Sequence, residues 1–242
     1  LEVGGFVATA FAGVGGIGFS LTDVTFGALL VSDTKGTTVT TDDINYMALK
    51  ANAVSAALVG ISGLTATVTS LSVVVNKTSD LVNTNTVLDF VDTATNATDN
   101  AAASRVIATG PTTANVTLDI DGDEGVLVAV KTDLTLDVFG FVQLTGSLAF
   151  KQATGSFVLT NGTTHVSNAT TLANVKYLEV GGFVATAFAG VGGIGFNLSD
   201  VTFGALLVSD TKNTTTTADD INYLALKANA VSAALVGISG LT

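Results

Sequence analysis

The amino-acid sequence predicts an all-β protein that forms an elongated tandem-repeat array, with a β-solenoid-like architecture preferred and a string of β-sandwich domains as the alternative. Apolar and polar residues alternate with the period of two that is typical of strands. Val, Thr and Gly are abundant whereas Glu, Lys, Arg and Gln are scarce, which disfavours helices. A long segment also occurs twice, and such repetition is typical of repeat architectures.

The repeated segment divides the chain into one complete unit and the start of another. Leu1–Thr65 matches Leu178–Thr242, so residues 1–177 form one full repeat unit and residues 178–242 begin the next, near-identical unit. No proline-rich or Gly/Ser-rich linker separates Tyr177 from Leu178, so we expect the units to stack directly in an array that continues beyond this segment. The two copies differ at six positions: Ser20/Asn197, Thr22/Ser199, Gly36/Asn213, Val39/Thr216, Thr41/Ala218 and Met47/Leu224.

Strands are predicted along the whole unit. Three stretches carry the clearest pattern, residues 45–76, 134–150 and 178–210. In residues 134–150 one face is apolar and the other mostly polar, and Gly140 and Gly146 predict bends or close backbone approach. The glycine-rich segment Val14–Gly18 and the pair Gly60 and Gly63 divide the other stretches into strands of ordinary length. Polar segments predict loops or turns at 32–43, 76–86, 92–100, 119–125 and 160–171.

The composition excludes several classes of function. The 242 residues include no cysteine, which excludes disulfide scaffolds, iron–sulfur sites and thiol catalysis. Nine basic residues stand against 20 acidic ones, for a formal net charge of −11, and this balance disfavours nucleic-acid binding. The uncharged stretch of residues 3–22 is rich in glycine, which is unfavourable in helices, so no membrane span is expected.

An acidic turn is the candidate metal site. Asp119, Asp121 and Asp123 alternate along this turn, and alternating carboxylates can converge on Ca²⁺. The turn is not an EF-hand, because Glu124 stands at the sixth position, where an EF-hand loop requires glycine. A solvated acidic turn between strands is the alternative interpretation, and no other cofactor is expected.

Seven Asn-x-Ser/Thr sequons are candidate N-glycosylation sites if the protein is exported. They lie at Asn76, Asn96, Asn115, Asn161, Asn168, Asn197 and Asn213. The single histidine, His165, lies in a polar loop, and the sequence contains no Gly-x-Ser-x-Gly motif for a nucleophilic serine. We therefore expect no catalytic residues and do not expect an enzyme.

Three segments carry a resemblance to a known group of proteins: residues 45–65 (NYMALKANAVSAALVGISGLT), 118–125 (LDIDGDEG) and 134–152 (LTLDVFGFVQLTGSLAFKQ). They resemble the tandem repeats of giant bacterial surface proteins described as adhesin-like or hemolysin-like. The resemblance implies repetition and an extracellular or cell-surface location. It implies no catalytic residues.

Together these observations predict a structural segment of a long extracellular or cell-surface fibre. Its partners would be copies of itself, joined in one covalent array or head to tail. The strong net negative charge would keep the outside hydrated. The alternative is an adhesin stalk or binding module in which Thr/Asn-rich loops contact surfaces or glycans and Ca²⁺ stiffens the turns.

Overall fold

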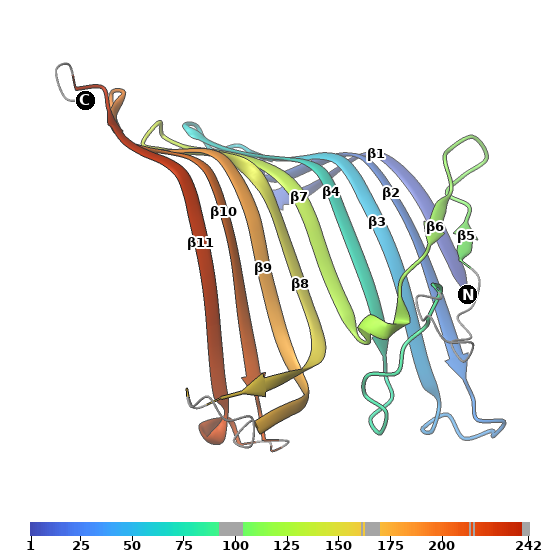
Figure 1. Ribbon diagram of the computed structural model, residues 1–242. Helices are drawn as coiled ribbons and strands as arrows, with labels where there is room; N and C mark the ends of the chain where they lie inside the picture. Colours follow the sequence, from blue (N-terminus) through green and yellow to red (C-terminus); the bar gives the residue numbers. More distant parts are fainter. Residues whose placement is uncertain (92–103, 161, 163–169, 213, 215, 239–242) are drawn as a thin grey trace.

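The computed structural model describes residues 1–91, 104–160, 162, 170–212, 214 and 216–238, and it confirms an all-β fold. Nine long strands form one antiparallel sheet, in the order β1-β2-β3-β4-β7-β8-β9-β10-β11 (Figure 1). The strands are β1 (Glu2–Val14), β2 (Ile17–Asp33), β3 (Ile44–Val59), β4 (Leu64–Thr78), β7 (Leu127–Val138), β8 (Val142–Leu159), β9 (Thr170–Val191), β10 (Ile194–Asp210) and β11 (Ile221–Val236).

The large sheet is a meander. Each of its strands pairs antiparallel with the preceding strand of the sheet, so the chain passes back and forth through one layer. In the described residues it does not wind into the coils that define a solenoid. β1 and β11 form the two edges, and Figure 1 shows them at opposite ends of the sheet.

The boundary between the two copies lies inside a strand. β9 spans both Tyr177 and Leu178, and it pairs with β8 on one side and β10 on the other. Its residues 179–191 repeat β1, while β10 repeats β2 and β11 repeats β3. The pairing is also repeated, because Gly27 lies opposite Lys50 and Gly204 lies opposite Lys227. The sheet therefore continues without interruption from one copy into the next.

Tight two-residue turns connect several strands. Gly15 and Gly16 have φ of 61° and 83°, and Gly192 and Gly193 have φ of 59° and 81°. Two successive positive φ angles are typical of the type I′ turns that join antiparallel strands. The predicted continuous stretch 134–150 is divided by such a turn, since Phe139 and Gly140 have φ of 52° and 72° between β7 and β8.

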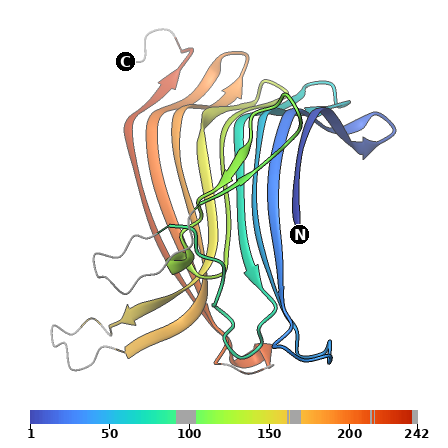
Figure 2. The same ribbon diagram turned by 90° about the vertical axis from the view of Figure 1, so that its right-hand side faces the viewer.

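The long strands bend near one end of the sheet (Figures 1 and 2). Four described residues inside strands adopt left-handed backbone conformations: Asp23 (φ 49°) in β2, Ser70 (φ 53°) in β4, Asn174 (φ 55°) in β9 and Asp200 (φ 50°) in β10. The register between β4 and β7 also shifts between Thr69 and Ser72. Such bulges bend a strand and increase its local twist.

A short hairpin covers one end of the sheet. β5 (Arg105–Ile107) and β6 (Val116–Leu118) form a separate two-stranded sheet, which lies against β1, β2 and β3 at the end of the large sheet where β1 lies (Figure 1). Ile107 and Leu118 are among the largest fully buried side chains of the described residues. They form the core together with Ala48, Phe90, Val116, Ile120, Leu127 and Ala153. The core thus lies between the first half of the sheet and the segment that leads into β7.

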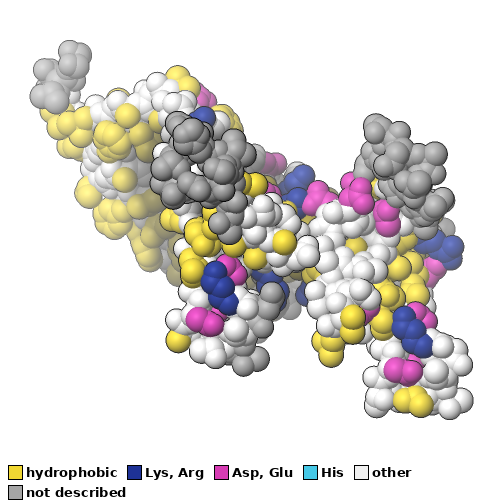
Figure 3. Space-filling model, turned by 60° about the horizontal axis from the view of Figure 1, so that its bottom comes forward, with side chains coloured by type: hydrophobic (Ala, Val, Ile, Leu, Met, Phe, Trp, Pro, Cys, Tyr) yellow, Lys and Arg dark blue, Asp and Glu magenta, His cyan; other side chains and the backbone are white. Residues whose placement is uncertain are grey.

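The rest of the sheet leaves much apolar surface exposed. The chain has 14627 Å² of accessible surface, whereas a compact monomer of 24.2 kDa has about 10,000 Å². In β11 alone Leu224, Leu226 and Val231 are 69%, 66% and 74% exposed. Figure 3 shows hydrophobic side chains gathered on the side of the molecule where β11 lies. Monomeric soluble proteins rarely expose apolar surface of this extent.

Candidate functional site

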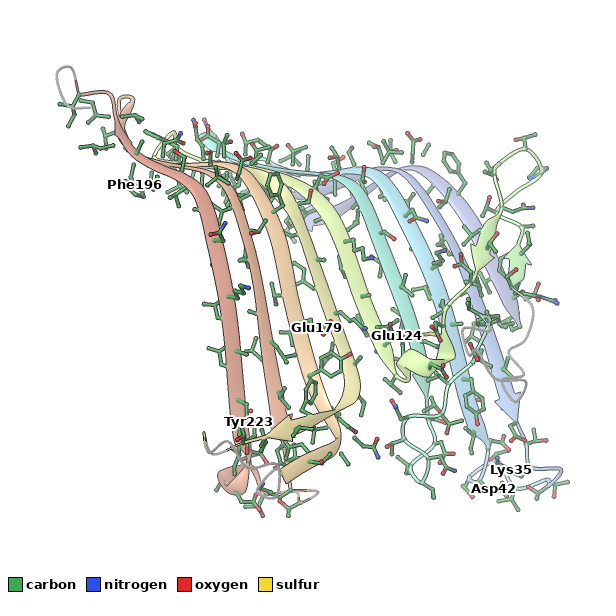
Figure 4. All side chains as sticks on the ribbon, viewed as in Figure 1. Lys35, Asp42, Glu124, Glu179, Phe196 and Tyr223 are labelled. Carbon is green, nitrogen blue, oxygen red and sulfur yellow. The ribbon has the colours of Figure 1, made fainter. Side chains whose placement is uncertain are left out.

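A groove of about 870 Å³ runs over the face of the sheet that carries the hairpin, from the acidic turn to β11. Four lysines contribute to its wall, Lys50, Lys131, Lys151 and Lys227, together with acidic residues that include Glu124 and Glu179. Figure 4 shows Glu179 in the middle of the sheet and Glu124 beside the start of β7. Its floor is built from small and apolar residues, among them Gly181, Gly204, Ala205 and Ala225.

In the first copy the hairpin covers this same face at two glycines. A Cβ atom on Gly4 would lie 2.2 Å from the carbonyl oxygen of Ala108, and one on Gly27 would lie 3.0 Å from the Cβ atoms of Ile107 and Val116. The contact at Gly4 leaves no room for a side chain, so the hairpin requires glycine there. At Gly27 a side chain would press on Ile107 and Val116, which would have to move by a few tenths of an ångström.

Two ion pairs fix the ends of the hairpin on the first copy. Arg105 at the start of β5 pairs with Glu2 of β1. Asp119, directly after β6, pairs with Lys50 of β3, with 2.5 Å between Lys50 Nζ and Asp119 Oδ1. Both pairs are partly exposed, so their main effect is to orient the hairpin rather than to stabilise it.

In the second copy the equivalent face is open. Gly204 repeats Gly27, and a Cβ atom added to it would meet nothing within 4 Å. Gly181 repeats Gly4, and a Cβ atom there would have Phe203 O at 3.8 Å as its nearest neighbour. Among the described residues, neither Glu179 nor Lys227 has an ion-pair partner, although they repeat Glu2 and Lys50.

A third ion pair lies where the groove meets the acidic turn. Lys151 of β8 pairs with Glu124 of the 3₁₀ helix Gly122–Glu124. Burial acts to lower the pKa of Lys151, but hydrogen bonds and charge interactions with Glu124 and Tyr177 together outweigh it and raise that pKa. Lys151 is therefore a fixed cation in the middle of the groove.

The predicted metal residues do not form a cluster. Asp119 is engaged by Lys50, and Asp121 Oδ1 accepts a hydrogen bond of 2.9 Å from the backbone N–H of Asp123. In this way Asp121 caps the 3₁₀ helix. Within the described ranges, no group of three or more His, Cys, Asp or Glu side chains is placed to hold a metal ion.

The sequons fall in very different surroundings. Asn115 is exposed beside β6, and Asn197 is half-buried in β10. Asn76 is fully buried in β4, where its Nδ2 donates to the carbonyl oxygen of Leu88 at 2.6 Å, so the folded chain leaves no room for a glycan there. Asn96, Asn161, Asn168, Asn213 and His165 lie outside the described residues.

One acidic turn after β4 is stabilised by backbone hydrogen bonds. Asp80 is 8% exposed, and its Oδ1 accepts from the N–H groups of Val82 and Asn83 at 2.8 and 2.9 Å. The bonds from Asn83 and Val82 hold the pKa of Asp80 below its usual range. This carboxylate fixes the path of the chain as it leaves the sheet.

Sequence reasoning missed the paired glycines and the hairpin above them. The signal available was the exact repetition of Gly4, Gly27 and Lys50 as Gly181, Gly204 and Lys227. That repetition does not show which face is covered, because the covering hairpin comes from residues that occur once.

Comparison of the chain with protein-family models, curated proteins and solved structures finds no match. The part of the chain that the structure describes holds no helix with the length and hydropathy that a membrane crossing requires.

Proposed function

We propose that this chain is a structural segment of a long extracellular or cell-surface fibre, in which tandem repeats extend one antiparallel sheet. One observation carries the proposal. The sequences of the two edge strands recur, with one difference, in strands that lie inside the same sheet. β11 and β3 differ only at Leu224 and Met47, and β1 is identical to residues 179–191 of β9.

Each open edge therefore has a known type of partner. β3 pairs with β2 on one side and with β4 on the other, whereas β11 pairs with β10 alone among the described residues. A strand equivalent to β4 would fit the outer edge of β11, and a strand equivalent to β8 would fit the outer edge of β1. Long unpaired edges are templates for strand addition, so growth at these edges is the expected use.

The number of strands in a unit supports the same proposal. Six strands of the large sheet begin between residue 1 and residue 169, namely β1, β2, β3, β4, β7 and β8, before β9 starts the second copy. An even number returns the chain to its original direction, so each copy meets the sheet in the same orientation. Strands are about 4.8 Å apart, so one unit would add about 29 Å along the sheet.

The large accessible surface also fits a segment rather than a free monomer. The accessible surface is larger by about 4,600 Å² than the area expected of a compact protein of this mass. Neighbouring units would bury part of this surface at both edges and on the face that the hairpin covers. The extracellular location is part of the proposal and is supported by the absence of cysteine and by the net charge of −11.

Chains that carry one, two or three units test the proposal. Small-angle scattering and electron microscopy should show one continuous particle that lengthens by about 29 Å for each unit. A matched control replaces the added copies of residues 66–78 with a Gly/Ser segment of equal length, which removes the strand expected on β11. Compact particles of constant size on flexible links would contradict a continuous sheet and would favour a string of separate domains.

A further inference from the structure

The open groove over β9, β10 and β11 matches the face that the β5–β6 hairpin covers over β1, β2 and β3. We propose that the part of the groove over β9, β10 and β11 is the seat that binds the equivalent hairpin of the second unit, that is, a second copy of residues 105–118. The inference rests on the proposed function, because it requires the rest of the second unit. It uses a separate observation, since it concerns the face of the sheet and not its edge.

The shapes of the two faces correspond at the glycines. In the first copy the hairpin fills the space above Gly4 and Gly27, while the space above Gly181 and Gly204 is empty. Gly27 is buried and Gly204 is exposed, although the residues around them in β2 and β10 are the same. The second copy thus keeps the flat floor that the hairpin needs.

The opposite face shows that the sheet itself is the same in both copies. A Cβ atom on Gly5 would lie 2.6 Å from the ring of Phe26, and one on Gly182 would lie 2.7 Å from the ring of Phe203. These contacts arise within the sheet and are reproduced. The difference at Gly4 and Gly27 therefore comes from the hairpin and not from a change in the strands.

The charges correspond as well. On the first copy, Glu2 forms an ion pair with Arg105, and Lys50 forms one with Asp119. On the second copy, Glu179 and Lys227 are exposed in the equivalent places. A hairpin with the sequence of residues 105–118, followed by its aspartate, would meet an acid at one end and a base at the other. Charge complementarity of this kind fixes orientation in an interface.

The conformation of the hairpin is fixed by contacts within the hairpin itself. Its strands pair Arg105 with Leu118 and Ile107 with Val116, and its connecting turn is held by Thr109, whose Oγ1 lies 2.7 Å from the carbonyl oxygen of Ala114. Ile107, Val116 and Leu118 form one apolar face, and all three are buried against the sheet. The same face would cover the small residues on the groove floor.

The reactivity of one lysine tests this inference in an extended chain. A copy of residues 66–177 is added after Thr242, which completes the second unit, and lysine acylation is followed residue by residue by mass spectrometry. In the original chain Lys227, which is exposed, should react faster than Lys50, whose side chain is 26% exposed and ion-paired. In the extended chain the reactivity of Lys227 should fall to that of Lys50.

Three further chains separate the hairpin from other causes of protection. Addition of residues 66–78 alone supplies the edge strand without the hairpin and should leave Lys227 reactive. Gly204→Val places a side chain in the space that the added hairpin would occupy. The variant should fold, because the space beside Gly204 is open. In the extended chain this substitution should restore the reactivity of Lys227. Asp119→Ala in the added copy removes the charge partner and should restore part of it.

The outcomes distinguish the two proposals. If the extended chain lengthens the sheet but Lys227 stays as reactive as before, the seat is wrong and the proposed function stands. Protection by residues 66–78 alone, or protection that survives Gly204→Val, also overturns the seat. If the sheet does not lengthen, the proposed function fails and the seat fails with it.

Discussion

Leu118 of β6 offers the sharpest test of the packing between the hairpin and the sheet. Its side chain is 0% exposed and lies in the core with Phe90, Ile107 and Leu127. Leu118→Ala removes three carbon atoms, which is worth about 2.4 kcal/mol in transfer free energy at about 0.8 kcal/mol for each methylene group. The cavity left behind adds to this loss, so the free energy of unfolding should fall by about 3–5 kcal/mol.

The loss can be measured by urea unfolding with two probes. Far-ultraviolet circular dichroism follows the whole sheet, and tyrosine fluorescence includes Tyr177, which packs against the same core. Coincident transitions would justify a two-state analysis. Leu81→Ala is the matched control, because Leu81 is 91% exposed and its loss should change stability by less than about 0.5 kcal/mol. A loss at Leu118 as small as that at Leu81 would refute the packing of the hairpin on the sheet.

Three other predictions use residues in contrasting surroundings. Ala48 is 0% exposed and its repeat Ala225 is exposed, so Ala48→Val should lower the unfolding free energy by about 1–3 kcal/mol in urea titrations, and Ala225→Val should leave it within about 0.5 kcal/mol. Because folding lowers the pKa of Asp80, its contribution to stability is full above its unfolded pKa of about 3.9 and is lost as pH falls through the folded value. Thermal unfolding of Asp80→Asn should therefore depend less on pH in that acid range, and an unchanged pH profile would contradict the assignment. Gly63→Ala should destabilise more than Gly140→Ala, since both have positive φ but only Gly63 has an aromatic ring 2.4 Å from the added Cβ, and chemical denaturation of both variants would show it.

The strand content could be predicted from the sequence because alternation requires only local information. The period of two in residues 134–150 correctly predicted strands, and Gly146 does lie against backbone, with an added Cβ 2.2 Å from Phe183 O. A bend or close backbone approach was predicted at Gly140, but a two-residue turn that includes Phe139 was not, because phenylalanine rarely adopts the positive φ that this turn gives it.

The arrangement of the strands depended on information that is not local. A solenoid and a meander can share the same alternation, and the pairing of β8 with β9 is what makes the second copy part of the first sheet. Asn76 illustrates the same difficulty for single residues. It was predicted where a β stretch ends and a loop begins, and it does lie near the end of β4, but its burial beneath the segment that carries Leu88 was not predicted.

The candidate site was the least predictable part. The three aspartates of the acidic turn suggested a metal site by their spacing alone, but Asp119 is held by a lysine that lies 69 residues earlier in the sequence. The glycines under the hairpin are informative only when the covered and open copies are compared. That comparison requires a structure that contains both.

The six-strand unit has a consequence for how such a protein changes length over generations. Near-identical repeats in a gene favour unequal recombination, which adds or removes whole units. Because each unit contains an even number of strands, any such event leaves every remaining loop on its original side of the sheet. In the proposed array the number of units could therefore change without altering the sheet, whereas a deletion of an odd number of strands would invert all that follows it.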